Sequence, residues 1–131
     1  MIAITNGKIV TVTGETYENG TVLVENGKIT AVGADVSIPA GAEVIDVKGG
    51  WVTPGLIDAH THICNFNEPD TMPALCKDGN EMSDPITPQV RAADAINPCD
   101  YAIEKVRNAG FTTVCTLPGS ANVCGGTGIV Y

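Results

Sequence analysis

The sequence predicts a mixed fold, in which a β-rich segment is followed by a parallel strand, helix and strand. Short β-branched runs broken by Asn-Gly pairs fill residues 2–47, whereas apolar strand-like runs at 56–62 and 111–117 enclose a helical pattern. Asn-Gly between such runs is a strong local signal for a hairpin, and alternation of strands with a helix favours a parallel sheet. We therefore expect two domains, residues 1–53 and 54–131.

Three Asn-Gly pairs organise the first domain as a β-meander. We expect hairpin turns at Asn6-Gly7 and at Asn26-Gly27, with Asn19-Gly20 in the loop between the two hairpins. Pro39-Ala40-Gly41 then predicts a turn into a further strand. The expected strands are residues 2–5, 8–12, 21–25, 28–32 and 43–47.

The second domain is predicted to contain a parallel strand–helix–strand unit. Asn97-Pro98 is a favourable helix start, an N-cap followed by proline at the first helical position, and Gly110 marks the end. Two strands connected by a helix pair in parallel, which here means residues 56–62 with 111–117. The connection over residues 63–97 has the length of a lid or substrate loop, and Thr87-Pro88 in it favours a short helix running to Ala95.

Composition excludes several classes of partner. The 131 residues carry a formal charge of -8, and their seven Lys and Arg are scattered, so a nucleic-acid or anionic-membrane partner is not expected. No apolar run approaches the ~20 residues that span a bilayer, and the N-terminus lacks the pattern of a secretory signal. We expect a soluble cytoplasmic protein.

The five cysteines form neither a disulfide framework nor a structural zinc site, because their number is odd and no C-x-x-C pair occurs. We expect reduced, mostly packed thiols. Cys64 continues the alternation of two nearby histidines, but packing is the favoured interpretation for it too. The five are Cys64, Cys76, Cys99, Cys115 and Cys124.

His60 and His62, the only two histidines, form the strongest candidate site. Alternate side chains of a strand share a face, so both imidazoles should point to one side and hold one divalent metal. The competing interpretation is two polar histidines in a loop. A third ligand within the chain would have to be Asp58, Cys64 or an acid in the following loop such as Glu68, and Asp58 better suits an orienting role.

The segment Trp51-Val52-Thr53-Pro54-Gly55-Leu56-Ile57-Asp58-Ala59-His60-Thr61-His62, which follows the meander, resembles the amidohydrolase superfamily. Further segments are similar to its imidazolonepropionase-related branch. They are residues 80–81, 84–89, 94–98 and 118–123.

This resemblance implies a metal-dependent hydrolase with a (β/α)8 TIM barrel and a small β-sandwich built from both ends of the chain. His60 and His62 match the first pair of metal ligands, with zinc as the expected ion and iron or manganese as alternatives. The expected reaction cleaves C–N bonds of amides or cyclic amides in a small-molecule substrate. Because a barrel needs ~250 residues, we expect an N-terminal portion with at most two barrel strands, inactive alone, whose general base and other ligands lie beyond residue 131.

Other functions fit the same residues. Within enzymes, a deaminase, a cyclic imide hydrolase or an N-acetyl-sugar deacetylase is an alternative. Outside enzymes, the chain would be a binding or scaffold domain that forms a homo-oligomer through its open strand edges.

Overall fold

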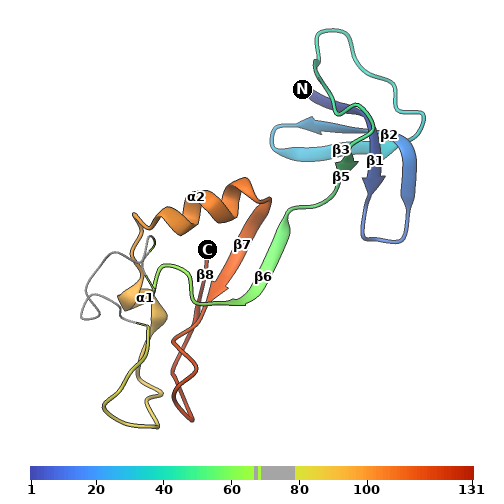
Figure 1. Cartoon of the computed structure of the whole chain (residues 1–131). Coiled ribbons are helices and arrows are strands. Elements are labelled where there is room, and N and C mark those ends of the chain that lie inside the picture. Colours follow the sequence, from blue (N-terminus) through green and yellow to red (C-terminus); the bar gives the residue numbers. More distant parts are fainter. Residues whose placement is uncertain (67, 69–78) are drawn as a thin grey trace. The chain divides into compact units, whose positions relative to one another are not determined.

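The computed structural model describes residues 1–66, 68 and 79–131. The chain divides into two compact units, Met1–Pro54 and Gly55–Tyr131 (Figure 1). In the described part of the chain, the helices are too short or too polar to cross a membrane.

The first unit is a single mixed sheet with the strand order β3-β2-β1-β4, and β5 also pairs with β1. The first three strands are antiparallel to one another, whereas β4 and β5 run parallel to β1. The strands are β1 (Ile2–Val10), β2 (Thr16–Glu25), β3 (Lys28–Gly33), β4 (Glu43–Asp46) and β5 (Trp51–Val52).

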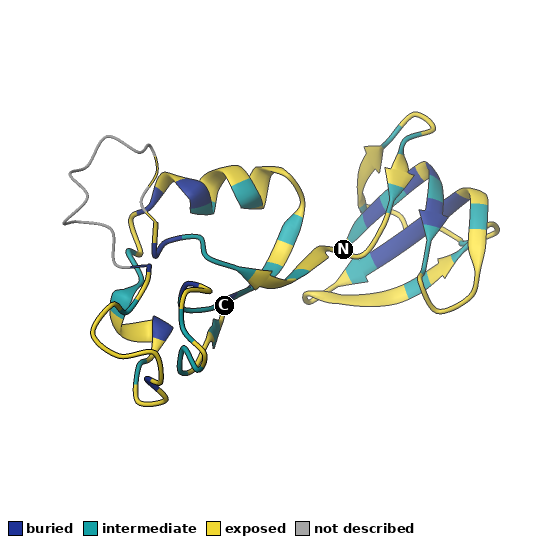
Figure 2. Ribbon diagram, turned by 60° about the horizontal axis from the view of Figure 1, so that its bottom comes forward, coloured by how far each residue is buried: buried dark blue, intermediate teal, exposed yellow. Residues whose placement is uncertain are grey.

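The core of this unit follows the alternation of β1. Ala3 and Ile9 are buried on β1 and Val22 and Leu23 on β2, with Ala3 paired to Leu23, and Figure 2 shows the buried stretch of the sheet. Apolar side chains on the other strands are exposed to solvent, and Trp51 is 71% exposed. The sheet is therefore covered only in part by the residues of its own unit.

The hairpin predicted at Asn6-Gly7 is wrong, because β1 continues through both residues. Asn6 has a φ of 57°, and the pairing of β1 with β2 shifts register on both sides of Gly7. The dipeptide therefore forms an irregularity within a long strand. The chain reverses after β1 instead, where the Thr11 N–H donates to the Glu15 carbonyl.

Asn19-Gly20 also lies inside a strand, which corrects its predicted position in a loop. Gly20 pairs with Gly7 across the sheet. A Cβ atom at Gly7 would lie 2.7 Å from Val47 Cγ2, and one at Gly20 would lie 2.6 Å from Ile9 Cγ1. These glycines are needed because neighbouring side chains fill the space, not because a turn requires them.

The third pair, Asn26-Gly27, forms the predicted hairpin. It is a two-residue connection between β2 and β3, closed by the Glu25–Lys28 pair. Both residues have positive φ, 50° and 73°, as a type I′ turn requires. The turn at Pro39-Ala40-Gly41 and the strand that follows it are confirmed as well.

The second unit contains the predicted parallel pair. β6 (Leu56–Thr61) and β7 (Phe111–Thr116) are parallel, and they are connected through α1 (Ala92–Ala95) and α2 (Tyr101–Asn108). A third strand, β8 (Ile129–Val130), which the sequence pattern did not predict, returns antiparallel to β7.

Helix α2 begins later than predicted. Asp100 is its N-cap, and its carboxylate accepts from the Ala102 N–H at 2.8 Å, whereas the Asn97 side chain accepts from the Cys99 N–H in the preceding turn. The predicted end is confirmed, because Gly110 follows the C-cap with a φ of 93°.

The helix predicted to run from Thr87-Pro88 to Ala95 is wrong over its first half. Only α1 is helical, and its N-cap Arg91 makes no side-chain capping bond. The buried Thr87 hydroxyl instead donates to the Cys124 carbonyl at 3.1 Å. This residue therefore ties its segment to the loop after β7.

Candidate metal site

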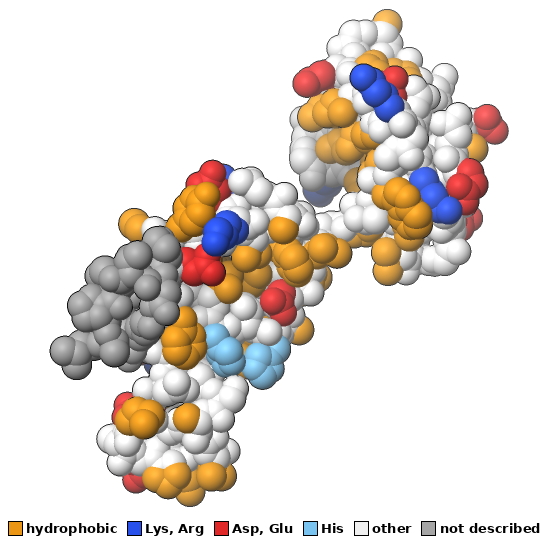
Figure 3. Space-filling view, in the orientation of Figure 1, with side chains coloured by type: hydrophobic (Ala, Val, Ile, Leu, Met, Phe, Trp, Pro, Cys, Tyr) orange, Lys and Arg blue, Asp and Glu red, His pale blue; other side chains and the backbone are white. Residues whose placement is uncertain are grey.

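The two histidines lie at the C-terminal end of β6. His60 is within the strand and His62 follows it directly. Their ring centroids are 5.3 Å apart and the ring planes are nearly perpendicular, at 89°. Figure 3 shows the imidazoles together on one face of the second unit. The two rings therefore point to the same side. This agrees with the alternation of side chains along a strand.

A backbone carbonyl from the neighbouring strand end orients His62. Its Nδ1 lies 2.9 Å from the Leu117 oxygen, directly after β7. Because a carbonyl oxygen only accepts, Nδ1 carries the proton, and in the neutral ring Nε2 is then the acceptor nitrogen. The Ser120 hydroxyl, 3.4 Å from Nε2, is positioned to donate to it. A ring nitrogen fixed in this way is the arrangement found in metal-binding histidines.

His60 occupies an irregular part of β6. The pairing of β6 with β7 shifts between Asp58 and Thr61, and the side chain of His60 is exposed. The Asp58 carboxylate accepts from the His60 N–H at 3.2 Å. Asp58 therefore contacts the backbone of His60, and its expected orienting role stays a prediction.

The strand that carries these histidines is open at two apolar positions. Leu56 and Ile57 are 48% and 70% exposed. The described residues of this chain leave these two side chains largely uncovered. Next to His62 there is a pocket of about 270 Å³, which Phe66 and Ala102 also line.

Cys64 belongs to a separate buried cluster. It is 1% exposed, and the Tyr131 hydroxyl donates to its Sγ at 3.2 Å. Burial is the main cause that raises the pKa of the Cys64 thiol. The packing interpretation of this cysteine is the one that the structure supports.

Glu68 pairs with Lys105 at 2.5 Å, and its N–H donates to Asp100. Within residues 1–66, 68 and 79–131, no three His, Cys, Asp or Glu side chains gather in a way that could hold a metal. The described part of the chain thus brings together two histidines and none of the third ligands considered from the sequence.

Four of the cysteines are free thiols, as expected. Cys99 is exposed, whereas the others are buried or half-buried; they are Cys64, Cys115 and Cys124. Cys76 lies outside the described residues.

Two residues near His62 were not singled out from the sequence. Asn65 is 2% exposed, and its Nδ2 donates to the same Leu117 oxygen at 3.1 Å. Ser120 lies within a segment that resembles the imidazolonepropionase-related branch, and this resemblance was the only feature of the sequence that pointed to it. For Asn65 the sequence offered none, because its partner lies 52 residues away.

Comparison with known proteins supports the predicted fold class. The chain matches the solved structure of an amidohydrolase from Thermotoga maritima MSB8 with a TM-score of 0.84 and 42% identity, covering 99% of this chain and 33% of that one. A mixed sheet followed by the first strand–helix–strand of a (β/α)8 barrel is consistent with this partial coverage.

Two curated relatives give the same family. The chain is 38% identical over 112 residues to amidohydrolase tasK of Hapsidospora irregularis, covering 82% of this chain and 11% of that protein. It is 57% identical over 53 residues to the imidazolonepropionase of Geobacillus kaustophilus (strain HTA426), covering 35% and 12%. The chain therefore spans about a tenth of the length of these relatives.

The Amidohydrolase family model matches residues 51–124, which include β6, both histidines and β7. This match covers more than half of the chain, and so the chain belongs to the amidohydrolase family.

Proposed function

We propose that this chain is part of a metal-dependent hydrolase that cleaves C–N bonds other than peptide bonds, and that His60 and His62 are two of its metal ligands. The observation that carries the proposal is the hydrogen bond from His62 Nδ1 to the Leu117 carbonyl, which makes Nε2 the acceptor nitrogen of the neutral ring, beside the second imidazole. Family membership supports the reaction class.

The position of the pair fits this chemistry. β6 and β7 are parallel, so His62 and Leu117 both follow the C-terminal ends of their strands. In (β/α)8 barrels the reactive groups lie at this end. His60 and His62 would hold a divalent ion there, which when bound would supply hydroxide at neutral pH by lowering the pKa of water to about 7. Imidazole nitrogens suit zinc, and they also suit iron.

The described part of the chain provides an incomplete site. Catalytic zinc usually has three protein ligands, and we assign two within the described residues. We therefore propose that the 131 residues take up metal weakly and show no turnover alone. The remaining ligands and the general base are proposed to lie outside these residues.

Zinc calorimetry tests the assignment. The His60→Ala, His62→Ala double variant should bind zinc at least about tenfold more weakly than the wild type, because the two substitutions remove both imidazole donors. Cys99→Ser is the matched control, because this exposed thiol is another possible zinc donor. Equal zinc affinity for the wild type and the double variant would contradict the proposal.

For the substrate we propose a small cyclic amide. The similarity to an imidazolonepropionase over 53 residues supports this class. A deaminase, a cyclic imide hydrolase or an N-acetyl-sugar deacetylase would use the same histidine pair with different substrate contacts. Hydrolysis assays of a longer chain that supplies the missing ligands distinguish these four substrate classes.

A second candidate is self-association through β6. This strand pairs only with β7 within the described residues, so its other edge is open, and its Ile57 is 70% exposed. Unpaired apolar edges favour pairing with another copy. Light scattering should then give a dimer for the wild type and a monomer for Ile57→Lys, and a monomeric wild type would exclude this function.

A further inference from the structure

The Leu117 carbonyl that orients His62 belongs to a peptide group with few ways to be anchored. Leu117 follows Thr116, the last residue of β7, so the group lies beyond the end of that strand. Its nitrogen belongs to Pro118, which has no N–H to donate. Hydrogen bonds can therefore hold this peptide group only at its oxygen, which has two lone pairs.

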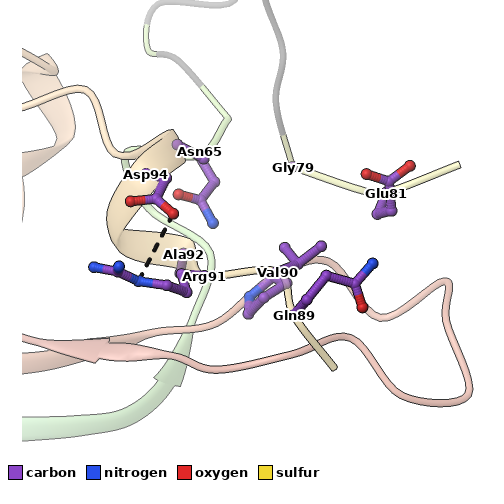
Figure 4. Close-up of a pocket in the computed structure, with 10 residues that line it drawn as sticks. Asn65, Gly79, Glu81, Gln89, Val90, Arg91, Ala92 and Asp94 are labelled. Atoms are coloured by element: carbon purple, nitrogen blue, oxygen red, sulfur yellow. Dashed lines mark ion pairs between the residues drawn. The ribbon is translucent and has the colours of Figure 1, made fainter. Parts of the chain in front are cut away.

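Two donors to this oxygen come from the turn that follows β6. His62 Nδ1 lies 2.9 Å from it, and Asn65 Nδ2 donates to it at 3.1 Å. The Asn65 N–H also donates to the His62 carbonyl at 3.2 Å, which closes the turn. Figure 4 shows the Asn65 side chain beside α1, with which it lines a pocket. One short segment thus provides both donors to a carbonyl that is 55 and 52 residues away in the sequence.

The turn itself is fixed at two further carbonyls. The Thr116 hydroxyl donates to the Ile63 carbonyl at 3.2 Å. The Asn97 N–H donates to the Cys64 carbonyl at 3.0 Å. Asn65 is 2% exposed, so bulk water does not compete for its amide. The side chain therefore has a fixed position from which it can hold its acceptor.

The orientation of the Asn65 amide indicates that its donor end matters. Oδ1 is buried and has no hydrogen-bond partner among the described residues. Exchanging the amide oxygen and nitrogen would set two acceptors, Oδ1 and the Leu117 oxygen, against each other. A buried acceptor without a partner costs free energy, so an apolar side chain of this size would suit packing better. What such a side chain cannot provide is the N–H for Leu117.

We propose that Asn65 is a positioning residue for His62. Its Nδ2 holds the Leu117 oxygen where the His62 Nδ1–H donates to it, which keeps the neutral ring in its Nδ1-protonated form with Nε2 as the acceptor nitrogen. The bond made by one ring nitrogen decides which nitrogen is available to a metal. The role toward a metal rests on the proposed function, whereas the effect on the ring does not.

Long-range ¹H–¹⁵N NMR of the full 131-residue chain tests the proposal. The sample contains EDTA at about pH 8.5, where an ordinary imidazole is neutral. The measured quantity is the ratio of the Nδ1-protonated to the Nε2-protonated form of His62. Asn65→Leu should lower this ratio about fivefold, which is the effect of one ordinary hydrogen bond. Asn65→Ala should lower it as well, and this smaller side chain decides the question if the leucine variant fails to fold.

Thr87→Val is the matched control. The buried Thr87 hydroxyl donates to the Cys124 carbonyl at 3.1 Å, so this variant also removes a buried hydrogen bond from a side chain to a backbone carbonyl of the same unit. We expect it to lower the stability of the unit, measured by amide exchange at Val114, and to leave the His62 ratio unchanged. An equal shift of the ratio in this control would overturn the proposal, because loss of stability alone would then account for the effect.

Two other results would overturn the proposal. They are an unchanged ratio in both Asn65 variants, and a wild-type His62 ring protonated mainly at Nε2. Because EDTA removes metal, these spectra are independent of the zinc calorimetry. Equal zinc affinity of the wild type and the His60→Ala, His62→Ala variant would contradict the metal assignment and not the role of Asn65, so the two failures are distinguishable.

Discussion

Replacing Asp100 with alanine removes one acceptor from two backbone N–H groups at once. The buried carboxylate caps α2 by accepting from the Ala102 N–H at 2.8 Å. It also accepts from the Glu68 N–H at 3.2 Å, which ties the chain beyond the histidine pair to this helix. The substitution should therefore loosen the second unit at two places.

The two losses are of similar size. Removal of an N-cap costs about 0.5–2 kcal/mol, and loss of a hydrogen bond to a charged group costs about 1.5–3 kcal/mol. Glu68 is exposed, so water replaces part of the second bond. We expect Asp100→Ala to reduce the free energy of unfolding of this unit by about 2–3 kcal/mol. Asp100→Asn keeps a capping oxygen and should cost about 1 kcal/mol or less.

Amide hydrogen exchange measures the change in the free energy of unfolding of the second unit. The Val114 N–H, bonded to the Tyr131 carbonyl at 2.9 Å, reports on the sheet of the second unit. Trp51, the single tryptophan, reports on the first unit by its fluorescence in urea, which should not change. A change below about 0.5 kcal/mol at Val114, or an Asn variant as unstable as the Ala variant, would refute the reasoning.

Three further predictions concern packing and ionisation. Gly20→Ala should lower the urea midpoint of the first unit by more than Gly27→Ala does. A Cβ at Gly20 would clash with neighbouring side chains, whereas a Cβ at Gly27 would meet open space and only the positive φ would be strained. Equal midpoints for the two variants would contradict this. Desolvation is the main cause that raises the pKa of Tyr131 from 10.0 to about 12. The neutral phenol therefore stabilises the second unit below pH 10, and this contribution is lost as the pH rises to about 12. Tyr131→Phe should make stability flatter over that range, measured by thermal melts between pH 9 and 12, and identical pH profiles would contradict the assignment. A thiol reagent should modify Cys99 well before Cys64, which is 1% exposed and has a raised thiol pKa, and mass mapping that finds equal rates would contradict the described burial.

The three Asn-Gly pairs show how far local sequence determines the first unit. Asn26-Gly27 forms the predicted turn, and a Cβ at Gly27 would meet nothing within 4 Å, so local preference decides there. At Gly7 and Gly20 the same dipeptide lies within strands. There the close approach of Val47 and Ile9 determines the role of glycine, and that contact is invisible in a local pattern.

The start of α2 shows a similar competition. Asn97-Pro98 and Asp100 are both favourable near a helix N-terminus. The structure uses Asp100, since its carboxylate also accepts from the distant Glu68 N–H. The bond to Glu68 joins residues 32 positions apart, so no local pattern could favour Asp100 over Asn97.

The candidate site divides in the same way. Alternation along β6 was enough to predict that His60 and His62 point to one side, and their rings lie 5.3 Å apart. The acceptor that orients His62 is a backbone carbonyl 55 residues away, so no side-chain pattern could reveal it. Their assignment as metal ligands stays a prediction.

The most direct measurement of this assignment is a long-range ¹H–¹⁵N NMR spectrum of the imidazole nitrogens, recorded without and with zinc. Our account predicts that His62 Nδ1 is protonated in both states, held by the Leu117 carbonyl. It also predicts that zinc shifts His62 Nε2 together with one ring nitrogen of His60. A His62 ring protonated at Nε2 instead, or ring nitrogens of both residues that stay unshifted with stoichiometric zinc, would contradict the central claim.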